Sequence, residues 1–177
     1  MIKKLNYYIF IDELNMRIIN NIIRLKKQKK KIYIVVRDVF LNEVLKFSRK
    51  NQIPIFVIDN LTLAIKNKVY GIFLTNEKKI LKNNIQATTK LKVIGLAHNQ
   101  IEYFIKNSQN CSMIMLSPIF YNAKYSNNKI LKPIRFNLIS LGWKKEVCAL
   151  GGINHQNIKL VNLTKSNSIG IKSLITK

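Results

Sequence analysis

The feature that most constrains this sequence is an alternation of short apolar segments with helical patterns, repeated along the whole chain. Each apolar segment is rich in β-branched or aromatic residues and predicts a buried strand. The predicted strands span residues 7–11, 32–36, 54–58, 69–74, 91–96, 113–116, 147–150 and 168–171. The helical patterns occupy residues 16–25, 41–47, 63–65, 77–81, 100–106, 136–141 and 156–163.

Strands that are apolar throughout and separated by helices indicate a parallel sheet covered by helices. Eight such repeats favour an α/β fold of the closed (β/α)₈ type, a TIM barrel, and an open doubly wound sheet is the alternative. At 177 residues the chain is shorter than the ~200 to 250 residues usual for these barrels. We therefore expect one compact barrel domain over residues 1–177, with short loops and trimmed helices.

The charge balance is strongly positive, with 31 lysine and arginine residues against 8 aspartate and glutamate residues and a formal net charge of +23. Such a surface attracts polyanions, from phosphorylated metabolites to nucleic acid. Lysine, isoleucine and asparagine are all abundant, and because A/T-rich codons specify all three, genome composition alone can produce this charge. The basic residues are scattered and form no recognised nucleic-acid-binding module, so nucleic-acid binding is a distant alternative.

The two cysteines and the N-terminus bear on the cellular compartment. Cys111 and Cys148 are far apart and match no metal or redox spacing, which predicts buried, reduced thiols. The N-terminal segment lacks a signal-peptide cleavage site, and no apolar run reaches 18 residues. We expect a soluble cytoplasmic protein that makes no membrane contact; a homo-oligomer is compatible with the sequence.

Polar residues follow the predicted strands one after another. In a barrel the carboxyl ends of the strands meet at a single mouth, where ligands bind. The residues in these positions are Asp12, Arg37, Asp59, Asn76, Glu77, His98, Asn99, Ser117, Gly151, Gly152 and Ser173, and Lys124 lies in the polar loop 121–132. Together they suit a phosphorylated ligand, with Mg²⁺ as a candidate cofactor. The alternatives are that Asp12 and Asp59 cap helices and that His98 is an ordinary loop residue.

The glycine pair Gly151–Gly152 lies between the strand at 147–150 and the helical pattern at 156–163. Adjacent glycines let a backbone approach a ligand closely, and a helix N-terminus favours an anion. Asn154 is a candidate N-cap for that helix. The pair therefore predicts an anion site, and a tight βα turn without a ligand is the alternative.

Several segments, in this order, resemble the motifs of one enzyme family. They are YIFID at 8–12, IPIFVIDN at 53–60, YGIFLTNE at 70–77, SPIF at 117–120, LGGI at 150–153 and IKSLI at 171–175. The chain thus resembles the thiamine phosphate synthases and the related thiazole tautomerases. The resemblance runs from the first strand to the last and is strongest from residue 94 onward.

The resemblance implies roles for individual residues. Gly151, Gly152 and Ser173 correspond to groups that bind phosphate, and Ser117 opens the segment before the phosphate-binding loop. Asp59 corresponds to a Mg²⁺ ligand, and Arg37 to a basic residue that faces the pyrimidine diphosphate. Lys124 is the cation kept in the loop 121–126.

The chain also departs from the family pattern, chiefly on the metal side. Phe73 stands where the family has histidine, Thr75 where it has glycine, and Lys78 where a second acidic Mg²⁺ ligand is expected. Ile58 replaces an asparagine, and Leu96–Ala97 before His98 lacks both family hydroxyls. The phosphate side is thus retained, while the side that holds Mg²⁺ and pyrophosphate is eroded.

These observations leave four functions open. The first is a transferase that joins hydroxymethylpyrimidine diphosphate to thiazole phosphate in thiamine biosynthesis, with Arg37, Lys124 and Asp59 stabilising the departing pyrophosphate. The second is a metal-independent thiazole phosphate tautomerase with His98 as the general base. The third is a non-catalytic relative that binds a phosphorylated ligand, and the fourth is nucleic-acid binding.

Overall fold

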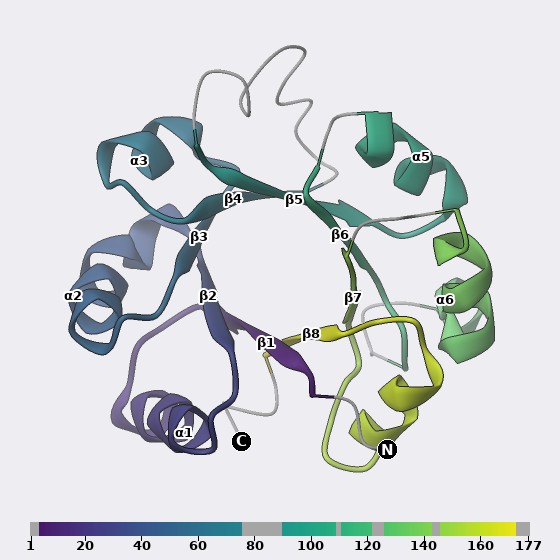
Figure 1. Cartoon of the computed structure of the whole chain (residues 1–177), viewed down its shortest axis with the longest axis horizontal. Helices are drawn as coiled ribbons and strands as arrows, with labels where there is room; N and C mark the ends of the chain where they lie inside the picture. Colours follow the sequence, from purple (N-terminus) through teal and green to yellow (C-terminus); the bar gives the residue numbers. More distant parts are fainter. Residues whose placement is uncertain (1–3, 76–89, 109–110, 122–125, 143–145, 173–177) are drawn as a thin grey trace.

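The computed structural model describes residues 4–75, 90–108, 111–121, 126–142 and 146–172. In this part of the chain eight parallel strands form a closed ring in sequence order, and the first strand pairs with the last (Figure 1). The strands are β1 (Asn6–Ile11), β2 (Ile32–Val36), β3 (Ile55–Ile58), β4 (Gly71–Leu74), β5 (Lys92–Ala97), β6 (Met113–Leu116), β7 (Glu146–Leu150) and β8 (Ser168–Ile171). The predicted barrel is confirmed, and the open sheet is wrong.

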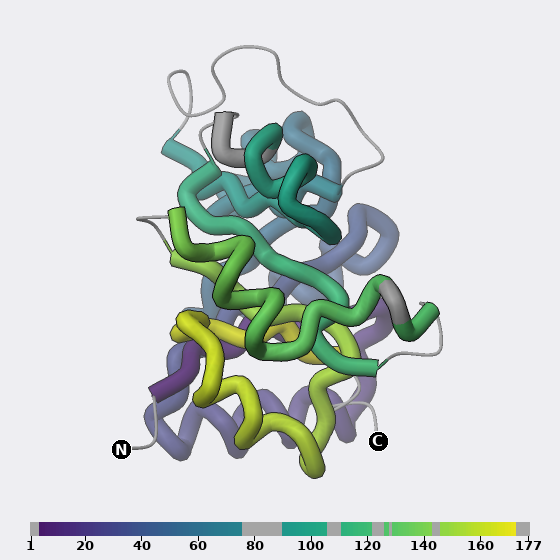
Figure 2. Tube along the Cα trace, turned by 90° about the vertical axis from the view of Figure 1, so that its right-hand side faces the viewer, coloured from purple at the N-terminus to yellow at the C-terminus, as the bar shows by residue number. Residues whose placement is uncertain are grey.

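Short helices surround the ring, as expected for a trimmed barrel (Figure 1). They are α1 (Met16–Lys27), η1 (Asp38–Phe40), α2 (Leu41–Asn51), α3 (Leu61–Lys66), α5 (Gln100–Ser108), η2 (Asn127–Lys129), α6 (Lys132–Ser140) and η3 (Ile158–Leu163), where η marks a 3₁₀ helix. Figure 2 shows α5, α6 and η3 following one another down one flank. The pattern predicted at 77–81 lies outside the described residues.

Two predicted helices differ from the observed ones. Helix α6 begins at Lys132 and not at 136, because Pro133 in its first turn is already suited to a helix start. The α-helix predicted at 156–163 is wrong, since a turn followed by the 3₁₀ helix η3 occupies this region. The chain after β7 therefore has no α-helical N-terminus aimed at the mouth.

The strands separate two apolar cores. The outer core lies between strands and helices and consists mainly of isoleucine, leucine and valine. The inner core fills the barrel with larger side chains, namely Tyr8, Tyr33, Val35, Phe56, Phe73, Ile94, Met113, Met115 and Cys148. Aliphatic residues usually dominate barrel interiors, so the aromatic content here is unusual. Strands of four to six residues offer few inward positions, and large side chains fill the space from them.

Both cysteines are fully buried and form no disulfide, as expected. Burial raises the pKa of the Cys148 thiol well above its ordinary value, so this group stays protonated and unreactive at neutral pH. No helix within the described ranges is both long and apolar enough to span a bilayer.

Gly71 makes room for the aromatic packing inside the barrel. It pairs with Phe56 in the β3–β4 register, and a Cβ added at Gly71 would lie 2.4 Å from Phe56 Cε1 and 2.3 Å from the Lys92 carbonyl oxygen. The backbone oxygen cannot move without distorting β5. A side chain at this position is therefore excluded.

We expect Gly71→Ala to lower the free energy of unfolding by about 1–3 kcal/mol, the usual cost of overpacking a core. Gly142→Ala is the matched control, because a Cβ there meets nothing within 4 Å. Urea unfolding of both variants, followed by far-UV circular dichroism, checks the difference. Equal stabilities for the two variants would show that the barrel adjusts freely around Phe56.

Candidate functional site

The residues predicted at strand ends lie at one mouth of the barrel wherever the structure describes them. Asp12, Arg37, Asp59, His98, Asn99, Ser117, Gly151 and Gly152 follow the carboxyl ends of their strands. Because the ring is closed, all of these ends meet at the same opening. Asn76, Glu77, Lys78, Lys124 and Ser173 lie outside the described residues, so their predicted roles stay predictions.

An apolar floor closes this mouth, and sequence reasoning missed it. It consists of partly exposed residues that pack on the inner core near the carboxyl ends of their strands, namely Phe10, Ile58, Leu96 and Leu150. The Phe10 ring meets the Phe73 ring edge-on, with 5.3 Å between the centroids. Period-two alternation within the predicted strands was the available signal, since each of these residues lies two positions from another inward residue. Such a floor suits the carbon framework of a small ring.

The glycine pair adopts a conformation that ordinary side chains avoid. Gly151 has φ +88° and Gly152 has φ +72°. A Cβ added at Gly152 would lie 2.4 Å from the Phe120 carbonyl oxygen and 2.5 Å from that of Tyr121. Glycine is thus required by both conformation and space, and the pair brings the backbone of two loops together.

The hydrogen bonds of the pair leave its donors available. The Gly151 carbonyl oxygen accepts from the Phe120 N–H at 3.2 Å, and the Gly152 carbonyl oxygen accepts from Asn157 Nδ2 at 2.8 Å. Among the described residues, neither glycine N–H donates to a turn, loop or side-chain acceptor outside the strand ladder. Consecutive N–H donors in a left-handed turn form the concave nest that binds anions. Asn154 Oδ1 accepts from the N–H groups of Gln156 and Asn157, so it caps the following turn.

Ser117 lies directly beside this turn. Its hydroxyl oxygen would be 2.8 Å from a Cβ at Gly151, and the residue is buried. The Ser117 hydroxyl therefore lies within reach of a group held by the glycine pair. The structure thus places Ser117 beside the glycine pair, and the role of Ser117 in ligand binding stays a prediction.

His98 is held by two hydrogen bonds, one to the residue that follows β6 and one to helix α5. Its Nδ1 lies 2.7 Å from the Ser117 carbonyl oxygen, and its backbone N–H donates to Glu102 Oε2 at 2.6 Å. A carbonyl oxygen only accepts, so Nδ1 carries a proton and donates it to this bond. Glu102 also accepts from Asn99 Nδ2 at 3.0 Å, which fixes the start of α5. His98 is thus held in a fixed orientation at the mouth, and its role as a base stays a prediction.

The carboxylate of Asp59 is engaged by Thr75. Asp59 Oδ1 accepts from the Thr75 N–H at 3.0 Å, and Oδ2 accepts from the Thr75 hydroxyl at 2.6 Å. The suggestion that Asp59 caps a helix is wrong, because Asn60 Oδ1 accepts from the Leu63 N–H at 3.1 Å and caps α3. Thr75 stands where the resemblance expects glycine, which has no hydroxyl to offer.

Asp12 and Lys172 form an ion pair across the junction of β1 and β8. The helix-cap alternative for Asp12 is also wrong, because Asn15 Oδ1 accepts from the Ile18 N–H at 3.0 Å and caps α1. Both side chains of the ion pair are about half exposed. Arg37 is exposed at the end of β2. Among the described residues, the mouth thus holds two cations, Arg37 and Lys172, and two carboxylates. Each of these carboxylates already has a partner, Lys172 for Asp12 and Thr75 for Asp59.

The described residues contain no assembled cluster of metal ligands. They contain no group of three or more His, Cys, Asp or Glu side chains placed to share a metal. Both oxygens of the predicted ligand, Asp59, already accept hydrogen bonds from Thr75. Mg²⁺ in proteins is usually held by one or two carboxylates together with substrate phosphates and water, and Asn76, Glu77 and Lys78 lie outside the described residues.

Two curated proteins resemble the chain over most of its length. A thiamine-phosphate synthase of Staphylococcus haemolyticus is 26% identical over 140 residues, which cover 76% of this chain and 65% of that protein. A thiamine-phosphate synthase of Mannheimia succiniciproducens is 23% identical over 136 residues, covering 75% and 62%. The chain therefore spans somewhat less than two thirds of the length of these relatives.

Solved structures share the fold. A thiamine phosphate pyrophosphorylase from Pyrococcus furiosus superposes with a TM-score of 0.71 at 18% identity, covering 97% of this chain and 87% of that one. The N-acetylmannosamine-6-phosphate 2-epimerase from Clostridium perfringens gives 0.64 at 14% identity, covering 99% and 89%. Both confirm the barrel.

The family is shown by a sequence match that covers most of the chain. The model of the family TMP-TENI, described as thiamine monophosphate synthase, matches residues 22–175. This range includes the glycine pair, Ser117, His98, Asp59 and Arg37. The chain belongs to the thiamine monophosphate synthase family.

Proposed function

We propose that this protein joins hydroxymethylpyrimidine diphosphate to thiazole phosphate and releases pyrophosphate. The observation that carries the proposal is the turn at Gly151–Gly152, whose carbonyl oxygens are engaged while its N–H groups donate to no turn, loop or side-chain acceptor among the described residues. The thiamine-phosphate synthases that resemble the chain supply the reaction. The thiazole phosphate would bind at this turn, with Ser117 beside it and Ser173 as a further predicted contact.

The reaction is a substitution at the methylene carbon of the pyrimidine. The carbon–oxygen bond to the diphosphate breaks, the pyrophosphate departs with the electron pair, and the thiazole nitrogen forms the new bond to the same carbon. The apolar floor of Phe10, Ile58, Leu96 and Leu150 supports the two rings and excludes water from the carbon that becomes cationic. Cations must stabilise the charge that develops on the leaving group.

Arg37 and Lys124 are the residues that we propose for this charge stabilisation. Arg37 is exposed at the end of β2, where its guanidinium can bind phosphate oxygens in a bidentate manner. The net charge of +23 raises the local concentration of anionic substrates around the mouth. Because the described residues contain no cluster of metal ligands, we assign this charge stabilisation chiefly to the basic groups, with Asp59 as a predicted Mg²⁺ ligand.

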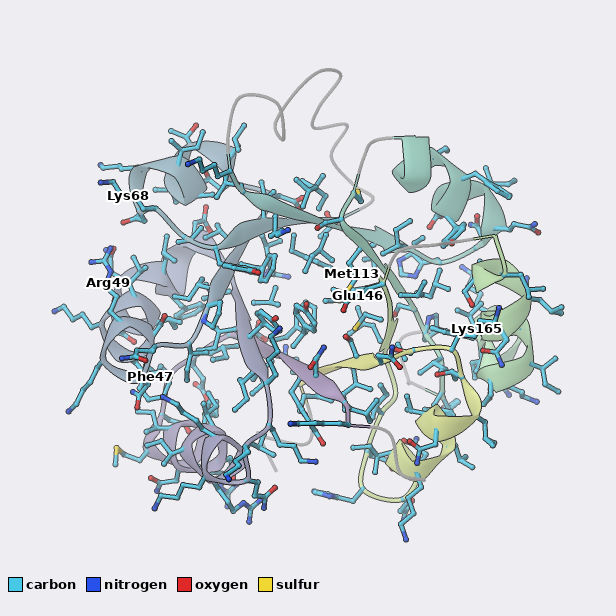
Figure 3. All side chains as sticks on the ribbon, viewed as in Figure 1. Phe47, Arg49, Lys68, Met113, Glu146 and Lys165 are labelled. Atoms are coloured by element: carbon cyan, nitrogen blue, oxygen red, sulfur yellow. The ribbon has the colours of Figure 1, made fainter. Side chains whose placement is uncertain are left out.

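The test is to incubate the full chain with both substrates and to measure pyrophosphate and thiamine phosphate. We expect the two products in equal amounts, and a loss of at least tenfold in rate for Arg37→Met. Lys68→Met is the control, because Lys68 follows α3 on the outer side of the ring and carries the same charge (Figure 3). An absence of both products at every Mg²⁺ concentration would contradict the synthase proposal.

Gly152→Asp tests the phosphate site itself. The added side chain would meet two carbonyl oxygens and place a negative charge beside the bound phosphate, so we expect thiazole phosphate to bind at least tenfold more weakly. Gly142→Asp carries the same charge into open space and should bind as the parent does. Calorimetric titration measures both affinities, and melting temperatures without ligand check the folds. Unchanged affinity in a folded Gly152→Asp variant would show that the pair is only a turn.

A second function is favoured by the orientation of His98. With Nδ1 bonded to the Ser117 carbonyl oxygen, Nε2 is a candidate general base for a metal-independent tautomerisation of a thiazole phosphate. In that reaction one ring proton is removed and one is returned at another position, with no other change. Nothing in this chemistry requires the eroded metal side.

Exchange of a thiazole phosphate proton with deuterated solvent, followed by NMR in the presence of a chelator, tests this function. If His98 is the base, His98→Gln should slow exchange by about 10²–10⁴-fold while the ligand still raises the melting temperature. Exchange at the parent rate in the variant would exclude His98 as the base. Catalysed exchange without thiamine phosphate synthesis would favour the tautomerase over the synthase.

A further inference from the structure

A cavity lies at the end of the barrel opposite the mouth, where the strands begin. Its volume is about 300 Å³, within the range of small-molecule sites. Lys31 precedes β2, Tyr70 precedes β4, Lys92 begins β5 and Glu146 begins β7. All four line the cavity together with Tyr33 and Phe56. None of them takes part in the mouth that contains the glycine pair.

Aromatic rings form the wall of this cavity. Tyr33 stacks on Tyr8 with 4.5 Å between ring centroids and 9° between ring planes. Tyr70 approaches Tyr33 at 5.9 Å and meets Phe56 edge-on at 5.5 Å. Tyr70 nevertheless remains 43% exposed. The cluster therefore ends in a half-exposed ring at the entrance, where a further planar ring can stack.

Charged groups lie along the same entrance. The Lys31 Nζ is 5.7 Å from the centroid of the Tyr33 ring. Hydrogen bonding to the Tyr33 side chain raises the pKa of Lys31, so this ammonium stays protonated at neutral pH. Lys92 and Glu146 begin the strands on either side of β6, and Figure 3 shows Glu146 and Met113 on the inner side of the ring. Lys31, Lys92 and Glu146 together give the cavity lining a net charge of +1.

A structural role alone does not require this combination. A solvated barrel end needs only polar side chains, and a packed one needs no cavity. Here an aromatic wall, a cavity and an unbalanced cation coincide. We propose that this cavity binds an aromatic carboxylate, a planar ring that carries one negative charge. The ring stacks on Tyr70 and Tyr33, and the carboxylate pairs with Lys31 and Lys92, which leaves the occupied site neutral.

NMR titration of the ¹⁵N-labelled full chain with benzoate tests this proposal. We expect shift changes concentrated at the amides of Ser112, Met113 and Glu146, with Gly151 and Gly152 unaffected. Cyclohexanecarboxylate has the same charge but no aromatic face, so it should bind at least severalfold more weakly. Shifts confined to the mouth with the glycine pair, or equal binding of the two acids, would overturn the proposal.

A matched pair of variants distinguishes benzoate binding in this cavity from nonspecific attraction of benzoate to a basic protein. Lys92→Met should weaken benzoate about tenfold, because it removes one charge-assisted hydrogen bond. Lys30→Met removes the same charge at the same end, where Lys30 Nζ lies 5.9 Å from the Tyr7 ring outside the cavity, and should bind as the parent does. Equal weakening in both variants would show that only net charge matters. The outcome is independent of the synthase proposal, which involves none of these residues.

Discussion

The pairing of β1 with β8 is the contact on which the rest of the structure depends. Four register pairs, from Asn6 with Ser168 to Ile9 with Ile171, close a series of parallel strands into a ring. Closure removes both edges of the sheet and makes every strand end meet its neighbours at one of two openings. It also brings Lys172 onto Asp12, 160 positions away in the sequence. Neither the mouth nor the cavity below it would exist in an open sheet.

The short strands then determine how the ring is filled. Four to six residues per strand give few inward positions, so bulky residues such as Tyr8, Tyr33 and Phe56 supply the volume. Glycines leave room for large inward side chains. Gly71 lies against Phe56, and a Cβ at Gly170 would lie 2.6 Å from Leu150 Cδ1. The same packing shapes both openings. It leaves an apolar floor under the glycine pair and exposed aromatic surface at the other end.

The sequence predicted the barrel and the order of its strand ends because these follow from local hydrophobic runs and from parallel connections. The alternative that two aspartates cap helices was wrong. Asp12 and Asp59 were read as candidate caps, yet Asn15 and Asn60 cap the helices while Lys172 and Thr75 engage the aspartates. The 3₁₀ helix after the glycine pair was also missed. Hydrophobic periodicity over a few residues does not distinguish it from an α-helix.

The predicted phosphate and metal sides of the mouth differ in the groups that would bind the ligand. This difference accounts for their unequal resemblance to the family pattern. The proposed phosphate site would use the backbone of Gly151 and Gly152, and substitutions elsewhere cannot remove those N–H groups. The predicted metal side depends on side chains, and a single residue, Thr75, is enough to change the hydrogen bonding of the Asp59 carboxylate. Glycine at position 75 would offer Asp59 only an N–H, whereas Thr75 adds a hydroxyl and engages the second carboxylate oxygen. Each carboxylate oxygen keeps a second lone pair, so these hydrogen bonds share Asp59 with a cation rather than exclude one. In the proposed reaction, the basic residues around the mouth supply further positive charge for the departing pyrophosphate.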